Sequence, residues 1–184
     1  MVVSGPSGVG KSTLIRETLS LYGPEIMATT VSYTTRPPRG EEKEGRDYHF
    51  VSKERFLALK EQYFFAEWAY VYNYYYATAV EQIERYWAED KAIIKDLDLR
   101  GADQIKKNYP QALRVFIAPP SVEELVHRVR KRQENSREEL KVRIEQALNE
   151  MEHGNSFDHY LANVDIQETI KKLKKIIDKY LKTV

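Results

Sequence analysis

The clearest chemical signal in this chain lies close to its start, in the run Gly5-Pro6-Ser7-Gly8-Val9-Gly10-Lys11-Ser12. This run fits the phosphate-loop pattern G-x-x-x-x-G-K-[ST]. Glycines let the backbone turn tightly and bring its N–H groups to phosphate oxygens, and the helix that follows adds the positive end of its dipole. Lys11 is expected to reach the β- and γ-phosphates and Ser12 to ligate Mg²⁺. The sequence therefore predicts a site for a nucleoside triphosphate.

The segments on either side of this loop have the character that such a site requires. Residues 1–3 are apolar and predict the end of a buried strand. Residues 13–19 begin a helix that carries Leu14, Ile15 and Leu19 on one face. A Gly-rich turn without a ligand is the alternative, and this strand–loop–helix context argues against it.

The composition limits which partners the protein can have. With 184 residues, the chain is long enough for one domain with a substantial core. It has 29 Lys and Arg against 28 Asp and Glu, so no overall charge favours a nucleic acid or an anionic membrane. We find no apolar stretch long enough for a bilayer and no leader-like start, and we expect a cytoplasmic protein. The absence of cysteine excludes thiolate zinc sites, and the four histidines lack ligand spacing.

Strands and helices are expected to alternate along the chain. Strands are predicted at residues 28–33, 48–51, 92–94, 113–117 and 160–164, and helices at 52–59, 78–89, 121 onward and 136–152. The chain is expected to close with a Lys-rich amphipathic helix that carries Ile170, Leu173, Ile176, Ile177 and Leu181. This alternation predicts an α/β fold whose parallel sheet has helices on both faces and ligands at the carboxyl ends of its strands. The aromatic residues 63–76 predict a small β-rich subdomain, with plain core packing as the alternative.

Arginines on loops narrow the type of reaction. Phosphoryl transfer needs converging positive charge more than covalent help from the protein. Arg36 and Arg39 flank a stiff Pro37-Pro38 pair and could grip one acceptor phosphate, although solvated loop charges are the alternative. Arg132 and Arg143 are eleven positions apart, which is about three helical turns and so nearly one face. They predict a lid, with a solvated basic helix face as the alternative.

Ordered motifs along almost the whole chain resemble those of guanylate kinases, which transfer phosphate from ATP to GMP. The resemblance is carried by residues 4–14, 31–39, 47–52, 65–69, 96–101 and 116–121. It implies a P-loop NTPase-type parallel sheet with helices on both faces, a small β-rich NMP-binding subdomain and a helical lid. As a single domain, the core is expected at 1–31, 79–125 and 145–184, the GMP-binding subdomain at about 32–78, and the lid at about 126–144.

The resemblance also implies a role for individual residues. ATP is expected at Gly5, Pro6, Ser7, Gly8, Val9, Gly10, Lys11, Ser12 and Thr13, with Asn163 near adenine. The GMP phosphate is expected at Ser32, Arg36, Arg39, Tyr48 and Tyr76, and the guanine base at Glu67, Thr78 and Asp98. Mg²⁺ is expected at Ser12 and Asp96, and catalysis is assigned to Lys11, Arg36, Arg132 and Arg143.

The carboxylate assigned to the base has a clear chemical reason. A carboxylate can accept hydrogen bonds from both N1–H and the amino group of guanine, whereas adenine presents a lone pair at N1 that it would repel. Glu67 is therefore the expected specificity residue, and a surface glutamate is its alternative.

The sequence departs from the family pattern at a few positions. Residues 73–77 lack both glycines of the usual Gly-Asn-Tyr-Tyr-Gly, which affects the turn that presents Tyr76. Lys95 stands where an apolar residue is usual, and Gln133 replaces the glycine after Arg132. Asn163 lies in a segment, residues 162–165, that departs from the family's Val-Asn-Asp-Asp, so its contact with adenine has the least support among these assignments.

The expected reaction is ATP plus GMP giving ADP plus GDP, with Mg²⁺ and without a protein general base. A kinase for another monophosphate or a phosphorylated sugar on the same scaffold is the first alternative. A non-catalytic module that binds phosphopeptides is the second, and such a module is expected to have lost its phosphate loop. No nucleic-acid or membrane partner is expected, and the oligomeric state stays open, with a homodimer among the alternatives.

Overall fold

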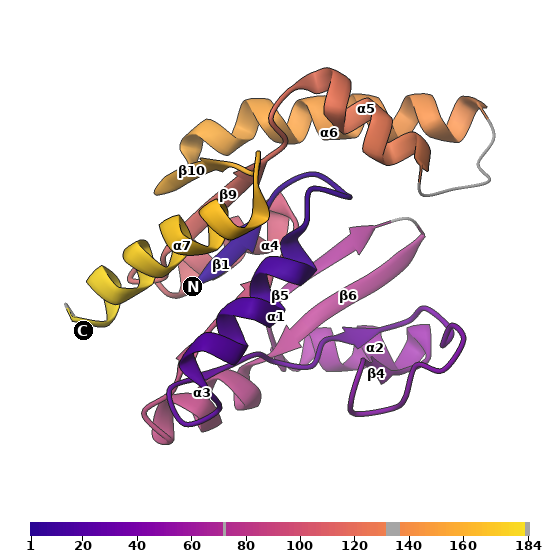
Figure 1. Ribbon diagram of the computed structural model, residues 1–184. Helices are drawn as coiled ribbons and strands as arrows, with labels where there is room; N and C mark the ends of the chain where they lie inside the picture. The colour runs from indigo at the N-terminus through magenta and orange to yellow at the C-terminus, as the bar shows by residue number, and fades with distance from the viewer. Residues whose placement is uncertain (72, 132–136, 183–184) are drawn as a thin grey trace.

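The computed structural model describes residues 1–71, 73–131 and 137–182 (Figure 1). In chain order its elements are β1 (Val2–Ser4), α1 (Lys11–Tyr22), β2 (Met27–Ala28), β3 (Tyr33–Thr34), β4 (His49–Phe50), α2 (Lys53–Glu61), β5 (Phe65–Val71), β6 (Tyr74–Ala79), α3 (Val80–Ala88), β7 (Ala92–Ile93), β8 (Lys95–Asp96), α4 (Leu99–Asn108), β9 (Arg114–Ala118), α5 (Val122–Lys131), α6 (Arg137–His153), the 3₁₀ turn η1 (Gly154–Ser156), β10 (His159–Ala162) and α7 (Ile166–Leu181). No helix in the described ranges is long and apolar enough to span a membrane.

The central sheet is parallel and carries the phosphate loop. Its strands lie in the order β10-β9-β1-β8, and β2 pairs with β7. Only Ile94 separates β7 from β8, and its N–H donates to the carbonyl of Ala28 at 2.9 Å, so the two ladders continue one another. This confirms the predicted parallel α/β fold, in which loops at the carboxyl ends of neighbouring strands meet.

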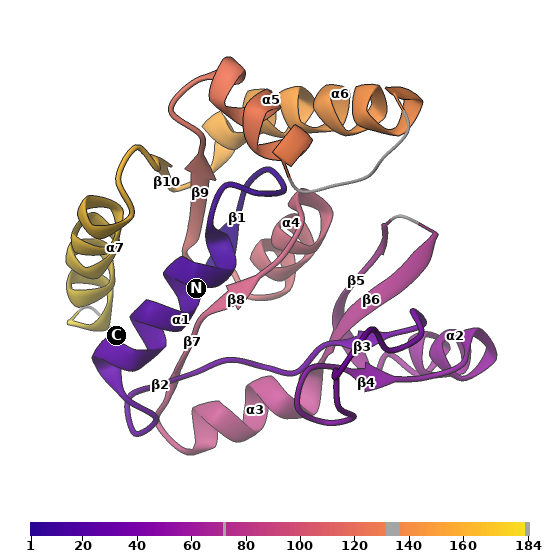
Figure 2. The same ribbon diagram turned by 45° about the vertical axis from the view of Figure 1, so that its right-hand side comes forward.

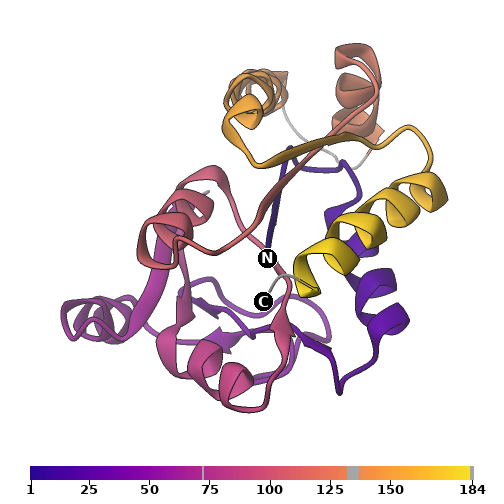
Figure 3. The ribbon, with the colours of Figure 1, turned by 90° about the vertical axis from the view of Figure 1, so that its left-hand side faces the viewer.

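Helices cover both faces of this sheet (Figures 2 and 3). On one face Ile94 and Ile117 pack with Leu14 of α1 and Leu173 of α7, and all four side chains are fully buried. On the other face, the strand residues pack against α3 and α4, in an apolar layer that includes Val2, Ile83, Leu97, Ile105 and Phe116. Fully burying a side chain of this size contributes ~1.5–3 kcal/mol, so the two layers fix the strand ends that present the site.

A second sheet projects beside the core, with the order β4-β3-β6-β5 and α2 packed on it (Figure 2). Its centre is aromatic: the ring of Phe56 lies 4.8 Å from that of Phe65 and 5.0 Å from that of Tyr75, and Phe56 is fully buried. The aromatic stretch therefore builds this small β-rich sheet.

Two sequence-based boundaries were wrong. Residues 28–33 do not form one strand, since β2 ends at Ala28 and β3 begins at Tyr33. Between them the chain crosses from one sheet to the other, and the backbone of Val31 forms hydrogen bonds of 2.8 and 2.9 Å with the side chain of Gln82. The helix expected from Thr78 starts at Val80, because Thr78 and Ala79 still pair with β5.

The helices α5 and α6 pack together above the phosphate loop (Figure 1). Leu125 and Ala147 are buried between them, and Ser121 caps α5 by accepting from the N–H of Glu124 at 3.2 Å. The helix expected over residues 136–152 was predicted to start at Ser136, which lies outside the described residues. Gly154 follows α6 and lies against Phe116 of β9. A Cβ at this position would stand 2.5 Å from the Phe116 ring.

Candidate active site

The phosphate loop connects β1 to α1 and needs its glycines. Gly5 has φ +144°, and a Cβ there would stand 2.1 Å from the carbonyl oxygen of Ile117 on β9. Gly10 has φ +103°, and its Cβ would stand 2.9 Å from Nδ2 of Asn163. Both positions combine a left-handed backbone with close contact, so the loop keeps its shape only with glycine there.

Lys11 lies across the loop that it follows. Its Nζ donates to the carbonyls of Gly5 at 2.7 Å and Pro6 at 3.1 Å, and it lies 3.9 Å from Oδ1 of Asp96. Asp96 pairs in register with Val3, one residue before the end of β1, which explains how it reaches the loop. These contacts bring together the lysine and the acidic residue that the sequence assigned to triphosphate and metal.

The donors near the loop fit a magnesium ion carried by a nucleotide. Ser12 is exposed in the first turn of α1, and the Asp96 side chain keeps 40% of its surface accessible. The surrounding protein desolvates Asp96 and so raises its pKa, while Lys11 opposes this shift. Among the described residues, no group of three or more His, Asp or Glu is placed to hold a metal by itself. Mg²⁺ usually takes one or two protein oxygens and completes its shell with water and phosphates, so this donor set suits it.

Asn163 contacts the phosphate loop from the end of β10. Its side chain is 5% exposed, and its Nδ2 donates to the carbonyl of Val9 at 2.7 Å. Its Oδ1 is buried without a hydrogen-bond partner in the described part of the chain. The structure thus links Asn163 to the loop backbone, and its contact with adenine stays a prediction.

Three of the residues assigned to the acceptor phosphate come together at the edge of the second sheet. The guanidinium of Arg36 is 5% exposed and lies 5.1 Å from the ring centroid of Tyr48. The rings of Tyr48 and Tyr76 are 6.1 Å apart. Ser32 stands nearby, since its carbonyl accepts from the N–H of His49 at 2.8 Å.

The acidic residue Glu42 joins this group and was missed in the sequence. Its Oε1 accepts from Nη2 of Arg36 at 2.8 Å, and its Oε2 accepts from the backbone N–H of Arg39 at 2.8 Å. The pKa of Arg36 is raised mainly by this hydrogen bond, and the pKa of Glu42 is lowered by it. Arg39 itself is exposed. The two glutamates that follow Gly40, at positions 41 and 42, were the available signal, since acidic residues near loop arginines can orient them through charge-assisted hydrogen bonds.

The residues that the sequence analysis assigned to the base meet where the second sheet faces α4. Glu67 on β5 is 3% exposed and pairs in register with Thr78 on β6, whose Oγ1 donates to Oε1 of Glu67 at 2.7 Å. Asp98 caps α4 and accepts from the N–H of Gly101 at 2.8 Å. A Cβ at Gly101 would stand 2.7 Å from Oε2 of Glu67, so the carboxylate rests directly on the helix start.

Burial changes how readily the carboxyl groups of Glu67 and Asp98 ionise. Desolvation raises the pKa of Glu67 to about 7, while the hydrogen bond from Thr78 and the positive charge of Lys95 act against this rise. Desolvation also raises the pKa of Asp98, and the N–H of Gly101 opposes it. Burial thus makes both carboxyl groups harder to ionise, and their few polar partners oppose this effect.

Glu150 of α6 is a further carboxyl group whose pKa depends on the charges of the phosphate-loop region. Burial raises the pKa of Glu150 to about 7, Lys11 lowers it, and Asp98 and Asp96 raise it. Glu150 follows Arg143 by seven positions in the sequence, or about two helical turns, and this spacing was the available signal for Glu150. Arg143 belongs to α6, but its side chain lies outside the described part of the structure, as does all of Arg132.

The parallel sheet, its phosphate loop and the acid-lined second sheet beside it define a P-loop kinase of the α/β class. A comparison with known protein families identifies the family within this class. The family model described as guanylate kinase matches residues 1–180, and the chain belongs to this family.

Individual relatives agree with this assignment. The chain is 41% identical over 177 residues to a guanylate kinase of Thermosynechococcus vestitus, which covers 96% of this chain and 92% of that protein. It is 42% identical over 176 residues to one from Shewanella sp., covering 96% and 84%. A crystal structure of guanylate kinase from Anaplasma phagocytophilum superposes with a TM-score of 0.76 at 30% identity, over 97% of this chain and 83% of that one.

Proposed function

We propose that this protein is a guanylate kinase, an ATP:GMP phosphotransferase that forms ADP and GDP. The observation that carries the proposal is the buried carboxylate of Glu67, which accepts from Thr78 at 2.7 Å and rests on the start of α4 that Asp98 caps. Family membership over residues 1–180 supports it. A phosphate loop alone would fit many NTP-using proteins, whereas an acidic purine pocket beside it favours a guanine nucleotide.

The donor nucleotide is proposed to occupy the loop. Backbone N–H groups of residues 5–13 would surround the phosphates, and the N-terminus of α1 would contribute its positive dipole end. Lys11, which contacts the loop carbonyls at 2.7 and 3.1 Å, would turn to the β- and γ-phosphates. Ser12 and Asp96 would hold Mg²⁺, which neutralises charge on the triphosphate when it is bound.

The acceptor is proposed to lie on the second sheet, with its phosphate at Arg36, Arg39, Ser32, Tyr48 and Tyr76. A GMP phosphate oxygen attacks the γ-phosphorus of ATP, and the bond from that phosphorus to the bridging oxygen of ADP breaks in line with it. The attacking oxygen is already anionic, so no side chain needs to remove a proton. The cationic groups stabilise the charge that spreads over the transferred group.

The base is proposed to bind between Glu67 and Asp98. The ionised carboxylate of Glu67 would accept from N1–H and the amino group of guanine, and Thr78 keeps Oε1 in place. Adenine would leave this buried carboxylate facing a lone pair, which is costly and gives the pocket its selectivity.

The helices α5 and α6 are proposed to act as the lid, with Arg132 and Arg143 as its cationic residues. The charges of Lys11 and Asp96 affect the pKa of Glu150 on α6, which supports a lid that lies near the phosphate loop. Closure of such an element replaces water with fixed charge around the transferring group.

An assay with different acceptors tests this proposal. ADP release is measured in a coupled assay with ATP, Mg²⁺ and either GMP, AMP, CMP or UMP, and we expect GMP to be preferred by at least about 10³-fold in kcat/KM. A preference for another monophosphate or a phosphorylated sugar would support the alternative kinase on this scaffold. We further propose a cytoplasmic location, where both nucleotides are used, and light scattering would decide between a monomer and a homodimer.

A further inference from the structure

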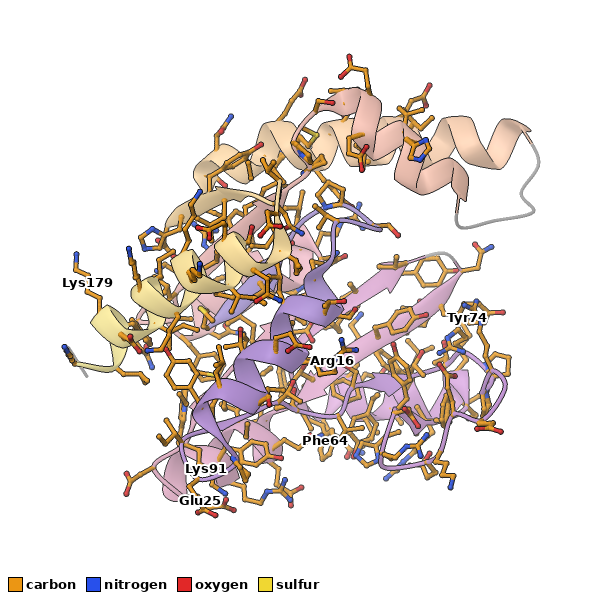
Figure 4. The ribbon with its side chains drawn as sticks, viewed as in Figure 1. Arg16, Glu25, Phe64, Tyr74, Lys91 and Lys179 are labelled. Atoms are coloured by element: carbon orange, nitrogen blue, oxygen red, sulfur yellow. The ribbon has the colours of Figure 1, made fainter. Side chains whose placement is uncertain are left out.

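The strand that carries Glu67 lies at the edge of its sheet and is irregular just before this residue. In the chain β5 runs between Phe64 and Tyr74, which are labelled in Figure 4, and it ends the strand order β4-β3-β6-β5. Its register against β6 shifts by one residue between Phe65 and Glu67, so Ala66 is an extra residue that forms a β-bulge. A bulge interrupts the alternation of side chains and re-aims the one that follows. Ala66 and Glu67 are accordingly both buried.

Side chains of α4 bond to the outer edge of β5. Gln104 bonds twice to the backbone of Trp68: its Oε1 accepts from the N–H at 3.2 Å, and its Nε2 donates to the carbonyl at 2.7 Å. Nε2 also donates to the carbonyl of Arg100 at 3.2 Å, one turn earlier in α4, which orients the amide. Asn108 donates from Nδ2 to the carbonyl of Ala66 at 2.9 Å. The two amides thus satisfy backbone groups that an edge strand leaves unpaired.

These bonds hold the strand on either side of Glu67 to one face of α4. Ala66 precedes Glu67 and Trp68 follows it, and their partners on α4 are four residues apart, which is one helical turn. Gly101, three residues before Gln104, lies on the same face, and a Cβ there would stand 2.7 Å from Oε2 of Glu67. The helix face that holds the strand is therefore also the face on which the carboxylate rests.

We propose that Gln104 is a positioning residue for base recognition, which keeps β5 against α4 so that the carboxylate of Glu67 stands where guanine is expected. The inference rests on the proposed GMP activity and deepens it. Thr78 orients Oε1 from β6 at 2.7 Å, and the bonds from α4 set how far Oε2 stands from the helix start that Asp98 caps. Since a displacement of about 1 Å can cost an enzyme about 10²-fold in rate, a residue that fixes this distance matters for recognition.

A purely structural role for Gln104 would have a different signature. If the side chain only stabilised the fold, its loss would lower activity towards every acceptor by the same factor. The carboxylate of Glu67 is proposed to favour guanine over adenine, so a misplaced carboxylate should reduce kcat/KM for GMP and leave kcat/KM for AMP nearly unchanged. The ratio of these two constants therefore separates positioning from stability.

The experiment compares the wild-type chain with Q104M, N108A and K106M. Q104M keeps the length of the side chain but removes both bonds to β5. N108A removes the bond at the bulge from an exposed position, so it tests the same contact even if Q104M folds poorly. K106M is the matched control, because Lys106 also lies on α4 and donates to a backbone carbonyl, but to that of Ala112, which follows the helix, at 2.8 Å. For each protein, kcat/KM for GMP and for AMP, KM for ATP and the melting temperature are measured.

We expect Q104M to lower kcat/KM for GMP by about tenfold, as the loss of two hydrogen bonds predicts, and N108A to lower it by about threefold. KM for ATP should not change, kcat/KM for AMP should change little, and K106M should match the wild type. In an E67Q background, Q104M should cause no further change in the ratio of GMP to AMP, because the residue acts through Glu67.

Three results would overturn the inference: an equal loss for GMP and AMP, a loss of the same size in K106M, or an undiminished effect of Q104M in the E67Q background. A wild type that phosphorylated no GMP would instead defeat the proposed function. That outcome is distinct from an active wild type whose ratio of GMP to AMP stays the same in both Q104M and N108A, which would defeat the role of Gln104 alone.

Discussion

Removing the hydroxyl of Thr78 is the sharpest single test of the base pocket. Thr78→Val keeps nearly the same shape on β6 but deletes the donor that lies 2.7 Å from Oε1 of Glu67. Thr78 is 2% and Glu67 3% exposed, so bulk water has little access to replace the lost hydrogen bond. We therefore expect the carboxylate of Glu67 to be both less fixed and less readily ionised.

The size of the effect follows from the kind of bond that is lost. A hydrogen bond to a charged group contributes about 1.5–3 kcal/mol, which corresponds to about tenfold to hundredfold in binding. Since the hydrogen bond from Thr78 also lowers the pKa of Glu67, part of the loss should disappear at alkaline pH. We expect kcat/KM for GMP at pH 7 to fall by about tenfold or more, with KM for ATP unchanged.

The assay is coupled ADP release with GMP varied at saturating ATP and Mg²⁺. Thr169→Val is the matched control, because Thr169 is also 2% exposed and its hydroxyl donates to the carbonyl of Asp165 at 2.8 Å, but on α7. If Thr78→Val and Thr169→Val gave the same kcat/KM for GMP, the reasoning that links this hydroxyl to guanine recognition would be refuted.

Further perturbations test other parts of the site. Lys11→Met removes the cation that lies on the phosphate loop and should lower kcat by about 10²-fold or more while the melting temperature changes little; a wild-type kcat would contradict its role. Gly101→Ala places a Cβ 2.7 Å from Oε2 of Glu67, so steady-state kinetics should show kcat/KM for GMP reduced by about 10²-fold, and unchanged kinetics would show that the carboxylate does not rest there. Arg143→Ala should lower kcat more than it raises KM for GMP, as expected for a lid cation that acts in the transition state, and a pure KM effect would argue against a lid. In the pH profile of kcat/KM for GMP, activity should decrease below about pH 7 as Glu67 takes up a proton, and Glu67→Gln should abolish that limb; a limb that survives belongs to another group.

The phosphate loop could be predicted from the sequence because its signal is local. A phosphate loop depends on glycine backbone freedom and on a helix that starts at once, and both are visible in consecutive residues. Gly5 and Gly10 have the positive φ values that the pattern anticipates. The parallel sheet was likewise predictable from alternating strands and helices, and the family comparison confirms the fold.

The acceptor side was less predictable because it depends on pairing between distant segments. The contact of Glu67 with Thr78 arises from the register of β5 and β6, which the ten intervening residues do not specify. The strand expected over residues 28–33 failed because Gln82, far along the chain, supplies the hydrogen bonds of Val31. Glu42 and Glu150 were missed for a similar reason, since acidic side chains on a loop and a helix gain meaning only from the cations that they face in space.

We propose that a buried carboxylate selects the purine that receives phosphate from the loop-bound nucleotide. The most direct test is the ratio of kcat/KM for GMP to kcat/KM for AMP, measured for the wild type and for Glu67→Gln with the same ATP and Mg²⁺. We predict a ratio of at least about 10³ for the wild type and a fall of about tenfold or more in the variant. An equal ratio in the two proteins would contradict the claim.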